Sequence, residues 1–159
     1  MTTEIQMYKD NGFSGFKTVA SLLNDKSVLP EVPGVYIVIR DQKTAPVFLK
    51  TGTGGFFKGE DPNVEISTLQ ANWVETSKIV YIGKATSLKK RIGQLLSFGD
   101  GKNVGHKGGR YLWQLADSRN LLIAWKPTPN EIPRKVEERM IQEFRSAHAG
   151  MRPFANLQD

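Results

Sequence analysis

Three short runs of apolar residues along the chain are continuous and rich in β-branched and aromatic side chains. They lie at residues 34–39, 78–83 and 121–125. Runs of this length, bounded by proline, glycine or polar residues, are typical of buried strands. The pattern therefore predicts three strands, which we expect to form a small mixed sheet.

Longer segments with helical spacing follow the second and third runs. Behind the second run, Ser87 stands at an N-cap position and the apolar residues follow at i, i+4, i+7 and i+8: Leu88, Ile92, Leu95 and Leu96. A short helical run is expected around residues 112–116. Behind the third run, a long helix is predicted, with Asn130 as a possible cap and Gly150 just past its end. Its apolar positions are Val136, Met140, Ile141, Phe144 and Ala147.

Two parts of the chain lie outside this pattern. Residues 1–30 have helix-like apolar spacing from Phe16 onward and predict an N-terminal helical extension. Residues 41–77 are less regular, with a glycine-rich turn at 51–55 between short candidate strands at 47–50 and 56–57. These glycines lack the Gly-Lys-Ser/Thr ending of a P-loop, so an inserted hairpin or loop is the better interpretation. We expect residues 1–159 to form one α/β (α+β) domain, its three-stranded sheet flanked by helices.

Composition and charge narrow the function classes. The chain has no cysteine, which excludes disulfide frameworks, zinc fingers and thiol nucleophiles. It shows no signal-peptide pattern and no apolar run of membrane-spanning length, so a cytoplasmic protein without a membrane partner is expected. Residues 1–77 carry 7 basic and 9 acidic side chains, net −2, whereas residues 78–159 carry 15 and 7, net +8. A polyanionic partner is therefore expected to bind the second half.

Phenol and cationic side chains are concentrated on one predicted strand-turn-helix unit. Tyr36 lies on the first strand and Tyr81 on the second, and the residues after Tyr81 include four cations: Lys84, Lys89, Lys90 and Arg91. Tyrosines packed in a core and a solvated cationic face would give the same residue types. The spacing of these residues is what favours a functional interpretation.

Two short motifs, Gly34-Val35-Tyr36 and Tyr81-Ile82-Gly83, resemble those that define the GIY-YIG nucleases. In that family a lysine directly follows the glycine of the second motif. A leucine lies five residues after that glycine, and an arginine lies three residues after the leucine. Lys84, Leu88 and Arg91 fill these positions. The stretch 81–91 is most similar to the form found in the nuclease domain of the bacterial excision-repair subunit. The resemblance covers residues 33–156 and implies a nuclease fold.

The resemblance also implies a glutamate on a helix after the third strand and an asparagine shortly behind a proline. Asn156 follows Pro153, and the last helix offers Glu137, Glu138 and Glu143. Arg134 and Arg139 lie four residues before Glu138 and Glu143, whereas Glu137 has no basic residue at those offsets. Glu137 also falls on the apolar side of the helix, where an unpaired carboxylate is costly unless a cation binds it. It is therefore the metal-ligand candidate.

His106 lies in a glycine-rich loop where members of the family often place a histidine or tyrosine beside the scissile phosphate. A catalytic role and an incidental one are both open for it. The chain departs from the family pattern in spacing, because about forty-four residues lie between Tyr36 and Tyr81, and Glu137 and Asn156 are nineteen positions apart. The first spacing implies the insertion at 41–77.

The resemblance predicts a metal-dependent endonuclease that hydrolyses phosphodiester bonds in duplex or branched DNA. One Mg²⁺ or Mn²⁺ ion held by Glu137 suits a site with a single carboxylate and no cysteine. Arg91 would bind the non-bridging oxygens, Lys84 would favour the Tyr81 phenolate, and Tyr36 or Tyr81 would act as the base. Asn156 would hold the site together. Non-specific backbone contacts are expected from five further cations: Lys89, Lys90, Lys102, Lys107 and Arg110.

Two alternatives have other consequences. A catalytically silent nucleic-acid-binding module of the same fold would keep the basic face and lose cleavage. A protein interaction domain would turn that face towards an acidic partner. A restriction enzyme, a repair nuclease and a mobile-element nuclease would all share these residues.

Overall fold

The computed structural model of the protein describes residues 3–157, except for the side chain of Lys107. The α-helices are α1 (Glu4–Asp10), α2 (Val19–Asn24), α3 (Ile66–Asn72), α4 (Leu88–Gly99) and α5 (Pro133–Ala147). The strands are β1 (Ser14–Thr18), β2 (Gly34–Ile39), β3 (Ile79–Ala85) and β4 (Leu122–Pro127). Short 3₁₀ helices are η1 (Phe57–Gly59), η2 (Lys107–Gln114) and η3 (Ser118–Asn120). The fold is thus α+β, as expected.

The sheet has four strands in the order β1-β4-β2-β3, and every neighbouring pair is antiparallel. The prediction of a three-stranded mixed sheet was wrong in both respects. β3 precedes α4 in the sequence, β4 follows it, and the two strands run in the same direction. In the sheet, β2 lies between β3 and β4, so they do not form a parallel pair.

The extra strand β1 replaces part of the predicted N-terminal helix. Gly15 and Phe16 both have positive φ values, 95° and 55°, and the register with β4 shifts between Gly15 and Lys17. This bulge interrupts the alternation of side chains that would have marked a strand in the sequence. The extension is therefore α1, β1 and α2 instead of one helix.

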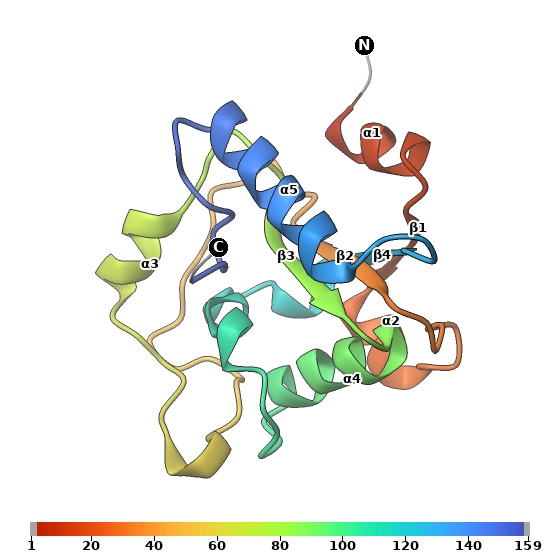
Figure 1. The fold of residues 1–159 in the computed structure, drawn as a ribbon. Helices are drawn as coiled ribbons and strands as arrows, with labels where there is room; N and C mark the ends of the chain where they lie inside the picture. The colour runs from red at the N-terminus through yellow and green to blue at the C-terminus, as the bar shows by residue number, and fades with distance from the viewer. Residues whose placement is uncertain (1–2, 158–159) are drawn as a thin grey trace.

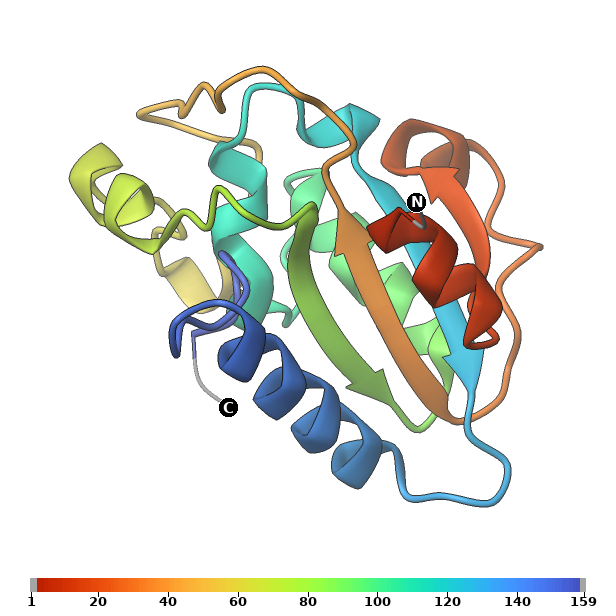
Figure 2. The ribbon, with the colours of Figure 1, turned by 90° about the horizontal axis from the view of Figure 1, so that it is seen from above.

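Helices cover both faces of the sheet (Figures 1 and 2). Val35, Ile37 and Ile39 of β2 pack in a core with Val136 and Ile141 of α5, to which α1 also contributes. The alternating residues Tyr36 and Val38 face a larger core that includes α2, α4 and η2. β2 is therefore buried on both sides, which explains its continuous apolar run.

The insertion at 41–77 contains no hairpin. Phe48 forms an isolated bridge with Leu115, and the rest of the segment comprises loops, η1 and α3. The buried Gln114 side chain holds the insertion by donating to Leu49 O at 3.0 Å and to Val64 O at 2.9 Å, and by accepting from Val64 N. The strand-like residues thus pair with the body of the protein instead of with each other.

Helix ends fix the position of the segments around the candidate residues. The Ser87 side chain caps α4 by accepting from Lys90 N, as predicted. α5 instead begins with Pro133 after Ile132, without a side-chain cap, so the assignment of Asn130 as a cap was wrong. Past α5, Gly150 has a φ of 82°, and its N–H donates to Arg145 O. Within residues 3–157, no helix has the length and apolar character needed to cross a membrane.

Candidate active site

The two motif tyrosines meet because of the register between β2 and β3. Tyr36 lies opposite Gly83, and a Cβ atom added to Gly83 would overlap the Tyr36 ring. Glycine at this position therefore allows the Tyr36 ring to lie across β3 and approach Tyr81, with the ring centroids 6.0 Å apart. Gly34 is needed for a different reason, because a Cβ there would overlap the backbone carbonyl of Lys126 on β4.

His106 completes an aromatic cluster with the two tyrosines. Its Nε2 is 2.9 Å from the Tyr36 hydroxyl, and its ring centroid is 5.9 Å from that of Tyr81. The cluster is almost closed to solvent, with exposed fractions of 1% for Tyr36, 8% for Tyr81 and 0% for His106. His106 Nδ1 is buried without a hydrogen-bond partner among the described residues.

Burial sets the protonation states of this cluster. Desolvation raises the pKa of Tyr81 to about 12 and raises that of Tyr36 well above its ordinary value. Desolvation, assisted by the positive charge of Arg91, lowers the pKa of His106 to about 3. Both phenols and the imidazole are thus neutral near pH 7. The predicted effect of Lys84 on Tyr81 is wrong, because the neighbouring cation that opposes the rise in its pKa is Arg91.

Arg91 reaches the cluster from α4. Its Nη1 donates to Gln94 Oε1 at 2.9 Å and to the Gly105 carbonyl at 3.0 Å. Its charge favours the ionised form of both tyrosines, although burial outweighs this effect. The sequence singled out Arg91 and missed the contacts of Gln94 and Gly105, because neither residue type signals a site.

Lys84 and Glu137 form an ion pair at 3.4 Å between Nζ and Oε1. Glu137 was expected to be unpaired, and this was wrong, because Lys84 of β3 supplies a cation that spacing along the helix does not reveal. The Glu137 side chain is 10% exposed and that of Lys84 is 48% exposed. Burial raises the pKa of Glu137, and Lys84 opposes the rise. Burial therefore destabilises the ionised form of the Glu137 carboxylate. Because Lys84 is half-exposed, its side chain can turn from the carboxylate towards solvent.

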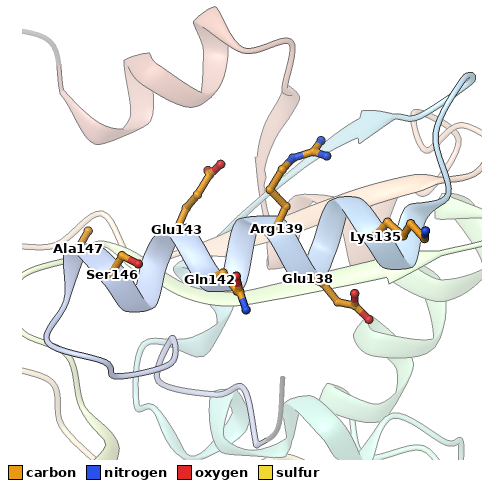
Figure 3. Close-up of a pocket in the computed structure, with 7 residues that line it drawn as sticks. All are labelled: Lys135, Glu138, Arg139, Gln142, Glu143, Ser146 and Ala147. Atoms are coloured by element: carbon orange, nitrogen blue, oxygen red, sulfur yellow. The ribbon is translucent and has the colours of Figure 1, made fainter.

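The other glutamates of α5 have different partners. Arg134 pairs with Glu138 at 3.3 Å, as predicted from their spacing. Arg139 pairs with Glu131 at 3.0 Å, so its predicted pairing with Glu143 is not formed. Glu138 and Arg139 line a shallow hollow of about 850 Å³ on the outer side of α5, which contains none of the candidate catalytic residues (Figure 3).

Alternation along β3 places the candidate residues on both sides of this strand. Tyr81 faces the α4 core, whereas Ile82 faces the α5 core. By the same alternation, Lys84 lies on the side of α5 and Glu137. Tyr81 and Lys84 therefore lie on opposite sides of β3. The phenols and the carboxylate approach one another around the edge strand.

Asn156 fixes that edge. Its Oδ1 accepts from Ile82 N and its Nδ2 donates to Ile82 O, both at 2.9 Å. The neighbouring Ala155 N donates to Val80 O at 2.8 Å. Both polar atoms of the Asn156 side chain thus hold the backbone between Tyr81 and Gly83. This agrees with the predicted supporting role.

A groove of about 420 Å³ opens beside Lys84 and Arg91. The sequence analysis missed Arg134, which belongs to this groove. The residues around it come from the turn before α4, from α4 and from the start of α5: Lys84, Ala85, Thr86, Ser87, Lys90, Arg91, Gln94, Ile132, Pro133 and Arg134.

The remaining predicted nucleic-acid contacts are more scattered. Lys89 pairs with Glu31 at 3.5 Å, and Arg110 lies over the Tyr111 ring. Lys102 lies in the loop after α4 and is exposed. The Lys107 side chain lies outside the part of the chain that the structure describes.

Glu137 is the residue best suited to hold a divalent ion. The described residues contain no group of three or more His, Cys, Asp or Glu side chains arranged to bind a metal. A single carboxylate nevertheless fits Mg²⁺, which is commonly bound through one or two carboxylates, waters and substrate phosphates. The ion pair with Lys84 shows that a positive charge is accommodated next to this carboxylate.

No protein-family model, no curated protein and no solved structure matches the chain.

Proposed function

We propose that the protein is a metal-dependent endonuclease of the GIY-YIG type that hydrolyses phosphodiester bonds in DNA. The observation that carries this proposal is the meeting of Tyr36, Tyr81 and Arg91 next to the Lys84–Glu137 pair. These residues come from β2, from the consecutive elements β3 and α4, and from α5, so three separate parts of the chain meet. They are also the residues selected by the resemblance of residues 33–156 to GIY-YIG nucleases.

Arg91 supplies the fixed positive charge for the phosphate. A guanidinium offers a planar set of donors that matches two phosphoryl oxygens and stabilises the charge that develops on them. In the free protein, one of these donors is satisfied by the Gly105 carbonyl. A phosphate oxygen would replace that neutral acceptor with a charged one.

The tyrosines position the attacking water. Water attacks phosphorus, the bond to the 3′ or 5′ oxygen breaks, and the proton lost by the water passes to a base. With a pKa of about 12, Tyr81 begins as a phenol, so a tyrosine accepts the proton of the water only in the phenolate form, which alkaline pH favours. Tyr36 and Tyr81 are alternatives for the base, and the other tyrosine would donate a hydrogen bond to the phosphate.

Glu137 would hold one Mg²⁺ or Mn²⁺ ion, which supplies Lewis-acid stabilisation of the phosphoryl and leaving oxygens. Lys84 keeps the carboxylate ionised until then, because its charge opposes the rise in the Glu137 pKa. The exposed end of Lys84 lets it move from the carboxylate to the groove. Asn156 holds β3, and thereby Tyr81, in place.

DNA would bind through its phosphates to Lys89, Lys90, Lys102, Lys107 and Arg110 and to the groove beside Arg91. Phosphate contacts of this kind carry no sequence information. Binding would therefore weaken steeply with salt.

A catalytically silent nucleic-acid-binding module is the second candidate. The nearly complete burial of Tyr36 and His106 favours it, because neither side chain is open to a ligand in this state. Such a module would retain the cations and bind DNA without cutting it.

The test is cleavage of four labelled DNA forms, which are duplex, single-stranded, branched and lesion-bearing, with Mg²⁺ or Mn²⁺. Cutting of at least one form that stops when the metal is chelated supports the endonuclease. Salt-sensitive retention of DNA without cutting supports the binding module. The absence of both cutting and retention supports the protein interaction domain with an acidic partner.

A further inference from the structure

Two groups that the proposed nuclease needs are covered by one loop. The segment of residues 99–109, here termed the glycine loop, begins at the last residue of α4 and ends within η2. Its His106 contacts the Tyr36 hydroxyl, and its Gly105 carbonyl accepts from Arg91. A phosphate reaching Tyr36 or replacing the contact with Arg91 would have to displace this loop.

The insertion at 41–77 holds the glycine loop from the other side. Lys58 N donates to Asn103 Oδ1 at 3.1 Å, and a Cβ added to Gly55 would overlap the carbonyl oxygen of Lys102. A Cβ added to Gly105 would lie 3.4 Å from the Phe57 ring, so the ring packs directly under the loop. Residues 55–58, here termed the clamp, therefore contact the loop around Lys102, Asn103 and Gly105.

The composition of the loop suits its part around residues 103–106 to moving. It contains five glycines, and Gly101 has a φ of 87°, which is rare for other residues. His106 Nδ1 has no partner among the described residues, so opening costs no hydrogen bond there and gives this atom access to water. Opening at residues 103–106 breaks the bonds of Asn103, Gly105 and His106. The start of the loop stays anchored, because Asp100 pairs with Arg119 at 2.7 Å and Lys102 N donates to Ser97 O.

From these contacts we propose that the glycine loop is a lid over the catalytic groups and that the clamp keeps it shut until DNA binds. The inference rests on the proposed nuclease function and gives a role to an insertion that this function leaves unexplained. In the closed state, His106 and the Gly105 carbonyl of the loop form hydrogen bonds with Tyr36 and Arg91. In the open state, a DNA phosphate takes the place of the Gly105 carbonyl on Arg91.

The lid makes a quantitative link between two measurements. If only the open form binds DNA productively, kcat/KM is proportional to the small fraction of molecules that are open. The rate at which a reagent modifies the buried His106 depends on the same fraction. A variant that loosens the clamp should therefore raise both quantities by the same factor.

Asn103→Ala loosens the clamp without touching a catalytic group. It removes one hydrogen bond to Lys58, which corresponds to about a 2- to 12-fold change in the open fraction. Phe57→Ala is a second variant that acts through packing. Asn72→Ala is the matched control, because Asn72 also lies in the insertion and bonds only within α3, to Thr68 O.

The first measurement is modification of the histidines by diethyl pyrocarbonate, followed by mass spectrometry. In the parent, His106 should react at least about tenfold more slowly than N-acetylhistidine, as expected for a group exposed only by opening. Asn103→Ala and Phe57→Ala should speed modification of His106 while leaving that of His148 unchanged. Asn72→Ala should match the parent. Modification of His106 in the parent as fast as N-acetylhistidine would show that no closed lid exists and would overturn the inference.

The second measurement is kcat/KM for DNA cleavage by the same variants. Equal factors for His106 modification and kcat/KM support the lid. Faster modification with unchanged or lower kcat/KM would overturn it, because opening would then not govern access. If the parent cuts no DNA form, the proposed function fails, whereas slow and clamp-sensitive modification of His106 would still establish the closed loop on its own.

Discussion

The two sides of β3 present different environments to the same proposed phosphate. On the aromatic side, Tyr36, Tyr81 and His106 are buried, and their burial keeps all three neutral. On the charged side, Lys84 and Glu137 form a partly open ion pair. Alternation along β3 thus places the neutral tyrosines on one side of the strand and the Lys84–Glu137 ion pair on the other.

This difference shows why the proposed phosphodiester hydrolysis needs groups from both sides of β3. The aromatic side has donors for a phosphate and candidates for a base, but its low polarity opposes ionisation. The charged side has a carboxylate for a cation, but it contains neither of the tyrosines proposed as the base. Arg91 links them, because it lines the groove beside Lys84 and its charge acts on both tyrosines and on His106.

Removing the link should have the largest graded effect. Arg91→Ala should lower kcat for DNA cleavage by roughly two to three powers of ten, as for the loss of one preorganised donor in a transition state. Arg91→Lys should restore little, because an ammonium lacks the planar pair of donors. Lys89→Ala, which removes a cation paired with the exposed Glu31, is the control. An equal loss in that variant would mean that only general positive charge is needed.

Removing single hydroxyls tests the aromatic side. Tyr36→Phe and Tyr81→Phe should each lose most of the cleavage activity, with the larger loss at the base, while the free energy of unfolding falls by only about 0.5–1.5 kcal/mol. Because the pKa of Tyr81 is about 12, the pH–rate profile of the parent should rise towards alkaline pH. Full activity of both phenylalanine variants would leave the tyrosines as core residues.

Adding one methyl group tests how the two strands bring the tyrosines together. Gly83→Ala should destabilise the fold by about 1–3 kcal/mol, because the new Cβ overlaps the Tyr36 ring. Gly93→Ala is the control within α4, where the added Cβ meets open space and should stabilise the helix by up to about 1 kcal/mol. Chemical denaturation of the two variants measures both values. Equal stability would show that Tyr36 does not need Gly83.

Acid should weaken the aromatic side through His106. The pKa of His106 is about 3 in the folded protein, whereas an unfolded histidine binds a proton below about 6.5. Stability is therefore lost as the pH falls from 6.5 towards 3, with a slope of at most about 1.4 kcal/mol per pH unit from this residue. His106→Gln should flatten the dependence of the free energy of unfolding on pH in this window. An unchanged slope would indicate that His106 is protonated in the folded protein.

The sequence predicted the parts of this arrangement that depend on local pattern. Buried strands, the Ser87 cap and the inward position of Glu137 follow from spacing alone, and the structure confirms them. The meeting of Tyr36 with Tyr81 was expected only through the resemblance to GIY-YIG nucleases, since strand register is not visible in either motif.

Features that depend on contacts distant in sequence could not be predicted. The Lys84–Glu137 pair joins residues on β3 and α5, and helix spacing reveals only partners on the same helix. β1 could not be recognised in the sequence, because the bulge with positive φ values at Gly15 and Phe16 interrupts the alternation typical of a strand. The raised pKa values of the tyrosines arise from their burial, which depends on contacts distant in sequence.

The most direct test of the nuclease is nicking of supercoiled plasmid by the parent, Glu137→Gln and Glu138→Gln in Mg²⁺, with and without a chelator. The parent and Glu138→Gln should nick only with metal. Glu137→Gln should retain DNA binding but show no nicking. Burial raises the pKa of Glu137, so the ionised carboxylate destabilises the fold above its ordinary pKa, and Glu137→Gln should melt at or above the parent temperature at pH 7. Nicking by folded Glu137→Gln at the parent rate, or no nicking by the parent, would contradict the account.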